Sequence, residues 1–248
     1  MKGIVFTFDD DVVSHCTVVA PIFQEYDYSC TFFLNFNRSL NLWGGACPTM
    51  TEEQIASLYE MGFEIGNHTY CHRLATAISS EELTDSIKKV NSIIEESYRQ
   101  EKPLTFCYPA YVSNSSTRDT LESLGFRLAR IGYERMETGQ EEKQKWHTYN
   151  RPNTWKRNQS HYYIPKKSDR FEVKCCGLFC PDYNIENFIE DISLCPKDGY
   201  CVFTGHLFHS NEEDKCFQDS VPISFLEKAL RHCRDKNFDV LNLKDLPI

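Results

Sequence analysis

A chain of 248 residues is short enough to form one domain if it is an α/β barrel or a large α/β sheet. Its apolar fraction of 41% allows a real core at this length, and its net charge of −9 argues against nucleic acid or an anionic membrane surface as the main partner. No apolar run approaches the ~20 residues that span a bilayer, so we expect no membrane-spanning segment.

The N-terminal sequence shows no secretory signal peptide, because Met1-Lys2-Gly3 leads directly into a strand-like apolar run. The sequence as written therefore predicts a cytoplasmic protein. In that setting we expect the 12 cysteines to be reduced thiols rather than a disulfide framework.

Strand-like and helix-like segments alternate along the chain, which predicts a mainly parallel sheet, either open or closed into a barrel. Apolar β-rich runs are assigned to strands, and segments with apolar residues three and four apart are assigned to helices, of which the longest is expected to be capped by Ser80. In chain order the expected elements are strand Gly3–Phe8, helix Val12–Tyr26, strand Cys30–Leu34, helix Thr51–Met61, strand Phe63–Gly66, helix Ser80–Arg99, strand Leu104–Tyr108, helix Ser115–Leu124, strand Arg127–Ile131, helix Asp182–Ser193, strand Tyr200–Thr204, helix Ile223–Asp235 and strand Phe238–Leu243.

The segment at about 133–170 interrupts this alternation with little periodicity, many charges and scattered Trp and Tyr residues. One interpretation is a surface insertion packed by its own aromatic side chains. The alternative is a lid or substrate platform, because sugar rings favour aromatic walls.

Polar side chains follow several of the predicted strands, where ligands of α/β proteins bind. Asp9 and Asp10 end the first strand, His68 and His72 follow the third, and His206 follows the strand at Tyr200–Thr204. If residues 68–72 turn into a helix, the two imidazoles lie on one face and can share a metal ion. One carboxylate with two imidazoles suits Zn²⁺ or a similar ion, which can acidify a bound water and polarise a carbonyl.

Two of these clusters also match known motifs. Thr7-Phe8-Asp9-Asp10-Asp11 resembles the T-F-D-D-G motif of polysaccharide deacetylases of the NodB-homology, carbohydrate esterase family 4 type, and His68-Thr69-Tyr70-Cys71-His72 resembles their H-[ST]-x-x-H motif. The resemblance implies a distorted (β/α) barrel of about seven or eight parallel strands, formed by a single domain over residues 1–248. It also implies metal-dependent removal of acetyl groups, usually from N-acetylated sugars.

The same resemblance implies roles for individual residues. Asp9 would be the catalytic base, and the metal ligands would be Asp10, His68 and His72. Phe106-Cys107-Tyr108-Pro109-Ala110-Tyr111 is similar to the third family motif, which implies that the Ala110 N–H helps to hold the oxyanion, with Tyr111 nearby. His206, in Gly205-His206-Leu207, would be the general acid for the leaving group, with His209 as a competitor.

Three features depart from the family pattern. Asp11 replaces a glycine, and Cys107 stands where many members carry an arginine that pairs with the base. Arg151 is the expected substitute for that arginine. The fourth family motif, D-x-x-D-W, is not recognisable in this sequence.

We therefore expect a Zn²⁺-dependent hydrolase that removes N-acetyl groups from an acetylated sugar or glycan. One alternative keeps the site and changes the bond, to an O-acetyl ester or a small amide. The other is a barrel that has lost catalysis and serves as a carbohydrate-binding module.

Overall fold

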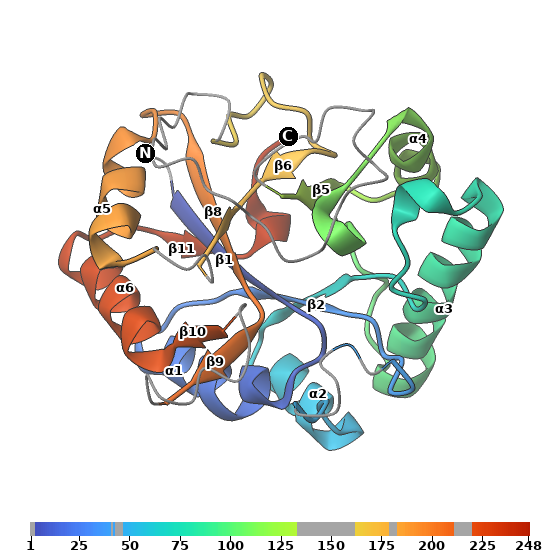
Figure 1. The fold of residues 1–248 in the computed structure, drawn as a ribbon, viewed down its shortest axis with the longest axis horizontal. Helices are drawn as coiled ribbons and strands as arrows, with labels where there is room; N and C mark the ends of the chain where they lie inside the picture. The colour runs from blue at the N-terminus through green and yellow to red at the C-terminus, as the bar shows by residue number, and fades with distance from the viewer. Residues whose placement is uncertain (1–2, 41, 43–46, 133–161, 179–182, 211–219) are drawn as a thin grey trace.

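The computed structural model describes residues 3–40, 42, 47–132, 162–178, 183–210 and 220–248. Eight strands follow one another in the order β6-β5-β4-β3-β2-β1-β8-β7, with β11 attached to β1. Every neighbouring pair is parallel, and helices α1 to α6 lie around the outside of the strands (Figure 1). The chain is a nearly closed α/β barrel in a single domain, which confirms the predicted fold.

The strands are β1 (Gly3–Asp9), β2 (Thr31–Leu34), β3 (Glu64–Asn67), β4 (Thr105–Cys107), β5 (Leu128–Ile131), β6 (Val173–Lys174), β7 (Cys176–Gly177), β8 (Tyr200–Gly205), β9 (Leu207–His209), β10 (Ser220–Pro222) and β11 (Val240–Leu241). The helices are α1 (Ala20–Glu25), α2 (Glu52–Glu60), α3 (Ser80–Tyr98), α4 (Ser115–Ser123), α5 (Ile185–Leu194) and α6 (Ile223–Asp235). A π-helical turn, His15–Val19, precedes α1.

A single bent run of five residues, 173–177, bridges the gap between β5 and β8. Val173 and Lys174 pair with β5, and Cys176 and Gly177 pair with β8. Cys175 alone separates the two pairs. One short segment thus joins β5 to β8, and its two-residue strands are too short to show a period in the sequence.

Strand β1 is the centre of the sheet, and all seven of its residues are buried. Alternate side chains point to opposite faces of a strand. Phe6 and Phe8 face outward and pack against Phe23 of α1, while Val5 belongs to the cluster inside the barrel with Phe33. This alternation places Asp9 on the inner side, at the carboxyl end of the strand.

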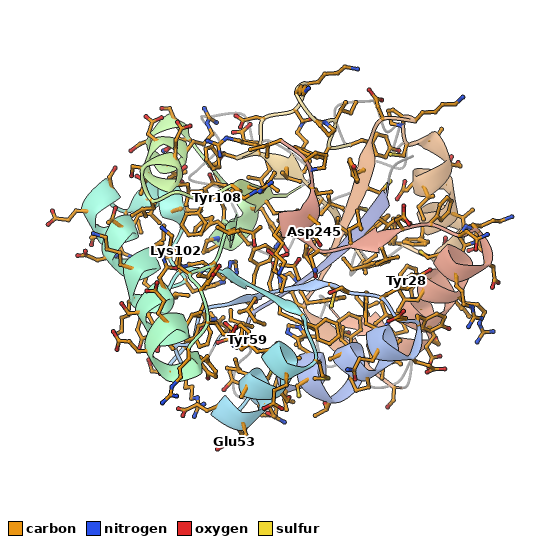
Figure 2. All side chains as sticks on the ribbon, turned by 180° about the vertical axis from the view of Figure 1, so that it is seen from behind. Tyr28, Glu53, Tyr59, Lys102, Tyr108 and Asp245 are labelled. Atoms are coloured by element: carbon orange, nitrogen blue, oxygen red, sulfur yellow. The ribbon has the colours of Figure 1, made fainter. Side chains whose placement is uncertain are left out.

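The opposite end of the barrel is closed by the C-terminal turn Leu243–Asp245. The Leu243 N–H donates to Thr31 Oγ1 at 2.9 Å, and the Lys244 N–H donates to Glu64 Oε2 at 3.0 Å. Asp245 of this turn lies near the middle of the view from behind, whereas Glu53 of α2 lies at the rim (Figure 2). These contacts fix the amino-terminal ends of the strands.

Several details differ from the sequence prediction. The first helix begins as a π-helical turn, and the N-cap of α3 is Ser79 rather than Ser80. The described end of the 133–170 segment is part of the barrel, because Tyr162 and Tyr163 are buried and Tyr163 pairs with Tyr200. Residues 133–161 lie outside the described residues. Within the described ranges, no helix combines the length and apolarity needed to cross a membrane.

Candidate metal centre and active site

Asp10, His68 and His72 converge at the carboxyl ends of β1 and β3. Asp10 Oδ1 lies 3.0 Å from His72 Nε2 and 3.4 Å from His68 Nε2, and the two Nε2 atoms are 3.2 Å apart. A metal ion bound tetrahedrally at about 2.0–2.1 Å separates its ligand atoms by about 3.3–3.4 Å. The spacing, the burial and the donor types of the three side chains therefore fit a divalent ion such as Zn²⁺.

The two histidines meet without a helix, contrary to the premise of the sequence prediction. Residues 68–72 form an irregular loop in which Thr69 (φ 59°) and His72 (φ 47°) are left-handed. Asn67 Oδ1 accepts from the Thr69 N–H at 2.8 Å, and Thr69 Oγ1 accepts from the His72 N–H at 3.2 Å. Ser86 of α3 anchors the loop from outside by accepting from the Cys71 N–H at 2.9 Å.

The orientation of His68 is fixed by its second ring nitrogen. His68 Nδ1 lies 2.9 Å from the Cys107 carbonyl oxygen, so Nδ1 carries the proton and Nε2 is left to bind a metal. Burial disfavours the charged form of Asp10, but the adjacent imidazoles of His68 and His72 hold the pKa of Asp10 well below its ordinary value. Asp10 is therefore ionised, as a carboxylate must be to bind a metal ion.

Asp9, the predicted base, is paired with a buried arginine that the sequence prediction missed. Arg130 Nη2 donates to Asp9 Oδ2 at 2.5 Å, and both side chains are at most 1% exposed. Arg130 lies on β5, where its register partner is Cys107 on β4. Arg151, the arginine expected here, lies outside the described residues. The sequence did contain a signal for Arg130, because it is the one charged residue in the apolar run Leu128-Ala129-Arg130-Ile131.

Arg130 is held by two thiols as well as by Asp9. Its Nη2 lies 2.6 Å from Cys107 Sγ, and its Nη1 lies 3.0 Å from Cys175 Sγ at the bend of the closing strand. Tyr111 covers the guanidinium at 5.1 Å from the ring centre. Cys107 thus occupies a position in which its small side chain leaves room for an arginine from the next strand.

The charge of Asp9 is set by competing effects. Burial raises the pKa of Asp9 most, but Arg130, His68 and His206 together hold that pKa below its ordinary value. Asp9 Oδ2 accepts a hydrogen bond from Arg130, while Asp9 Oδ1 makes no hydrogen bond to the described residues. Oδ1 is therefore the oxygen that can accept a proton.

His206 stands on the other side of Asp9, directly after β8. Its Nε2 lies 3.7 Å from Asp9 Oδ2, 3.9 Å from Asp10 Oδ2 and 3.1 Å from the Tyr111 hydroxyl. His209 makes no ion pair with Asp9 or Asp10 among those found in the described residues. Of the two histidines, His206 is therefore the one whose ring lies beside both carboxylates.

The turn at Pro109–Tyr111 has an unusual backbone. Ala110 (φ 57°) and Tyr111 (φ 62°) are both left-handed, which is rare for residues other than glycine and often marks a functional site. The Tyr111 N–H donates to the Tyr108 carbonyl at 2.9 Å, so the Ala110 N–H is the better oxyanion donor of the two. Gly132 permits this arrangement, because a Cβ there would lie 2.6 Å from Tyr111 Cβ.

Asp11, which departs from the family motif, supports the backbone. It is left-handed (φ 50°), and its carboxylate accepts from the Asn35 N–H at 2.8 Å and the Phe36 N–H at 2.7 Å. Burial raises the pKa of Asp11 to about 7, against the opposing effect of these two hydrogen bonds. Asp11 therefore ties the end of β1 to the loop after β2.

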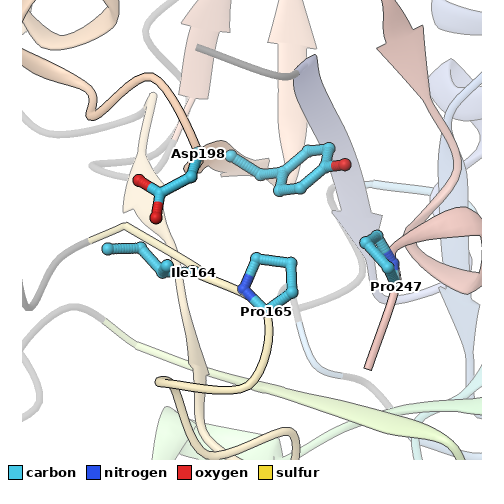
Figure 3. Close-up of a pocket in the computed structure, with 5 residues that line it drawn as sticks. Ile164, Pro165, Asp198 and Pro247 are labelled. Carbon is cyan, nitrogen blue, oxygen red and sulfur yellow. The ribbon is translucent and has the colours of Figure 1, made fainter.

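A separate pocket of about 320 Å³ contains none of the predicted site residues (Figure 3). It is lined by Ile164, Pro165, Asp198, Tyr200 and Pro247. Tyr200 begins β8, so this pocket lies at the opposite end of the strand from His206.

The fold and this site define an α/β barrel with a candidate Asp-His-His metal centre beside a buried Asp–Arg pair. The family model for polysaccharide deacetylases matches residues 1–129, just over half of the 248 residues. The chain therefore belongs to the polysaccharide deacetylase family, as its motifs predicted.

Individual relatives are distant. YxkH of Bacillus subtilis, which is named as a polysaccharide deacetylase, is 21% identical over 127 residues, which are 51% of this chain and 43% of YxkH. The aligned region thus spans less than half of that relative.

Solved structures of the same fold cover nearly the whole chain. The Xyl-CE4 domain of a multidomain xylanase from the hindgut metagenome of Trinervitermes trinervoides is 14% identical, with a TM-score of 0.58 over 99% of this chain and 89% of that one. Peptidoglycan deacetylase PdaC from Bacillus subtilis is 15% identical, with a TM-score of 0.56 over 98% and 88%. A CE4 pseudoenzyme from Bacillus anthracis is 14% identical, with a TM-score of 0.59 over 99% and 65%. At such identities these likenesses show the fold alone.

Proposed function

We propose that this protein is a metal-dependent hydrolase that removes N-acetyl groups from an acetylated sugar or glycan. The observation that supports this most is the juxtaposition of two units. The ligand atoms of Asp10, His68 and His72 lie 3.0–3.4 Å apart. Asp9, beside them, is held by a buried arginine and keeps one oxygen without a hydrogen bond to the described residues.

Asp10, His68 and His72 would hold the metal, and Zn²⁺ is the ion that this donor set suits best. A bound ion of this kind polarises the acetamide carbonyl and acidifies a neighbouring water. Asp9 Oδ1 takes a proton from the attacking water, while Arg130 keeps Asp9 ionised and oriented. The water oxygen bonds to the carbonyl carbon, and the Ala110 N–H supports the charge that develops on the carbonyl oxygen.

The C–N bond then breaks, and His206 Nε2 delivers a proton to the departing amine. The products are acetate and a free amino sugar. Neither Asp9 nor His206 needs to move far, since His206 Nε2 is 3.7 Å from Asp9 Oδ2 and the two flank the same space. We also propose a cytoplasmic location, in which the 12 cysteines of the chain would stay reduced.

Two variants test the assignment together. Asp9→Asn removes the base and should lower kcat on chitin-type oligomers by about 10²–10⁴-fold while zinc content, measured by atomic absorption, stays at the wild-type level. His72→Ala removes a ligand and should lower zinc content as well. An active Asp9→Asn variant would refute the base, and unchanged zinc in His72→Ala would refute the ligand set.

A second candidate function is a binding barrel without turnover. The structurally similar Bacillus anthracis protein is described as a pseudoenzyme, so the fold alone does not guarantee catalysis. Zinc-loaded protein that binds N-acetylglucosamine oligomers in calorimetry without releasing acetate would favour this candidate. A faster reaction on acetylated xylan than on chitin-type oligomers would instead favour an O-acetyl esterase on the same site.

A further inference from the structure

His15, the first residue of the π-helical turn, is fully buried between two aromatic rings. Its ring centre lies 5.9 Å from that of Phe8 and 5.5 Å from that of Phe32. His15 Nε2 lies 2.7 Å from the carbonyl oxygen of His206. Because a carbonyl only accepts, Nε2 must carry the proton, and Nδ1 makes no hydrogen bond to the described residues.

The His206 carbonyl needs such a donor because the chain changes sheets there. The register of β8 with β1 ends at Gly205, and the register of β9 with β10 begins at Leu207. His206 therefore falls between two ladders, and a buried carbonyl without a donor costs free energy. The imidazole of His15 reaches this carbonyl from the π-helical turn that follows β1, the strand that pairs with β8.

The His15 ring also keeps the same charge and the same tautomer near neutral pH. Burial lowers the pKa of His15 to about 4, so its ring is neutral near pH 7. A neutral ring has one N–H, which the carbonyl fixes at Nε2.

We propose that His15 is a positioning residue for the general acid: its N–H holds the backbone of His206 and thereby keeps His206 Nε2 beside Asp9 and the Tyr111 hydroxyl. The catalytic meaning of this contact rests on the proposed function. The contact itself does not, so it can be tested by a structural readout as well as by a kinetic one.

Three variants isolate the contact. His15→Phe keeps an aromatic ring between Phe8 and Phe32 but has no donor, and His15→Gln retains an N–H at a reach similar to Nε2. Thr17→Val is the matched control, because Thr17 lies on the same turn, is exposed and donates only outward, to the Val13 carbonyl at 3.1 Å.

The kinetic test compares two leaving groups in zinc-loaded enzyme. An N-acetyl sugar releases a basic amine that needs a proton, whereas an aryl acetate releases a phenolate that does not. His15→Phe should lower kcat on the N-acetyl sugar by about 10–100-fold, with KM and zinc content unchanged, and leave the aryl acetate rate within about twofold. His15→Gln should recover most of the lost rate, and Thr17→Val should match wild type. Equal losses on both substrates, or no loss in His15→Phe, would overturn the proposal.

Nuclear magnetic resonance on histidine-labelled protein separates this proposal from the proposed function. The His206 ring signals, assigned with His206→Gln, should shift in His15→Phe and stay in place in His15→Gln and Thr17→Val. If wild type hydrolyses neither substrate, the proposed function fails, and the ring signals still decide whether His15 positions His206. If His15→Phe does not fold, His15→Asn replaces it, since its shorter amide places the N–H near Nδ1 and should shift the same signals. Unshifted His206 signals in the folded variant would overturn the proposal.

Discussion

At the scale of single residues, Arg130 contributes to the stability of the barrel and sets the charge of Asp9 in the candidate site. The guanidinium has almost no exposure to water and is neutralised by Asp9 at 2.5 Å. Burial of two charges is costly, and the pair persists because Cys107 and Cys175 also accept from the arginine. Removing the arginine would leave Asp9 as an uncompensated charge in the barrel.

We expect Arg130→Gln to lower the free energy of unfolding by about 3–5 kcal/mol, the usual cost of breaking a buried ion pair. Urea unfolding followed by circular dichroism measures this. The control is Lys167→Gln, because the Lys167–Asp198 pair at 2.9 Å is more than half exposed on both sides and such pairs contribute at most about 1 kcal/mol. Similar costs for the two variants would show that Arg130 is not a structural ion-pair partner.

The sequence was informative about which residues meet at the candidate site and less so about their surroundings. Asp9, Asp10, His68 and His72 could be predicted because each follows an apolar run and sits in a motif. Arg130 could not be chosen over Arg151, because strand periodicity does not say which neighbouring strand faces Asp9. That choice depends on the β4–β5 register, which is a tertiary property.

At the scale of elements, the left-handed turn at Ala110 and Tyr111 depends on space left by the start of the loop after β5. Gly132→Ala would place a Cβ 2.6 Å from Tyr111 Cβ, so Tyr111, whose hydroxyl lies 3.1 Å from His206 Nε2, must shift. We expect a loss of stability of about 1–3 kcal/mol together with a lower kcat.

Gly62→Ala is the control for this substitution, because Gly62 has φ +84° but no atom within 4 Å of an added Cβ. It should cost about 1 kcal/mol and leave kcat unchanged. Melting temperature and turnover of the two variants check the comparison. Equal kcat in both would show that Tyr111 does not have to hold its place.

The cap of α3 gives a second prediction for an element. Ser79 Oγ accepts from the Glu82 N–H at 3.1 Å, and Glu82 Oε2 accepts from the Ser79 N–H at 3.0 Å. Ser79→Ala should therefore cost about 1 kcal/mol in urea unfolding, and Ser80→Ala, one residue inside the helix, should cost clearly less. The reverse order would support the cap that the sequence suggested.

The elements that could be predicted from the sequence are those long enough to repeat the hydrophobic pattern of a helix or strand several times. Helix α6 matches its predicted bounds, and β1 differs by one residue. Strands β6 and β7 have two residues each and therefore no readable period. For residues 68–72 the sequence analysis considered a helix as the way to bring the two histidines together. The observed loop depends instead on hydrogen bonds to Asn67, Thr69 and Ser86 that no local pattern reveals.

At the scale of the whole molecule, the buried His15 makes stability depend on pH. Its pKa is about 4 in the fold against an ordinary value of 6.5, so below pH 6.5 the unfolded chain binds a proton that the folded chain does not. The free energy of unfolding should therefore fall by roughly 3 kcal/mol from this group as the pH drops from 6.5 to 4.

The difference in unfolding free energy between wild type and His15→Gln isolates this contribution, since both proteins contain all the other histidines. Urea unfolding at several pH values should show the difference changing across that window and staying constant above it. Parallel curves would mean that His15 is not protonated on unfolding.

The five residues 173–177 that join β5 to β8 also carry the sulfur that touches Arg130. Without this segment, Arg130 would lose its contact with Cys175 Sγ, and the carboxyl of Asp9 would be more exposed to water. Under the proposed function, completion of the barrel and the setting of the base Asp9 would therefore depend on the same five residues.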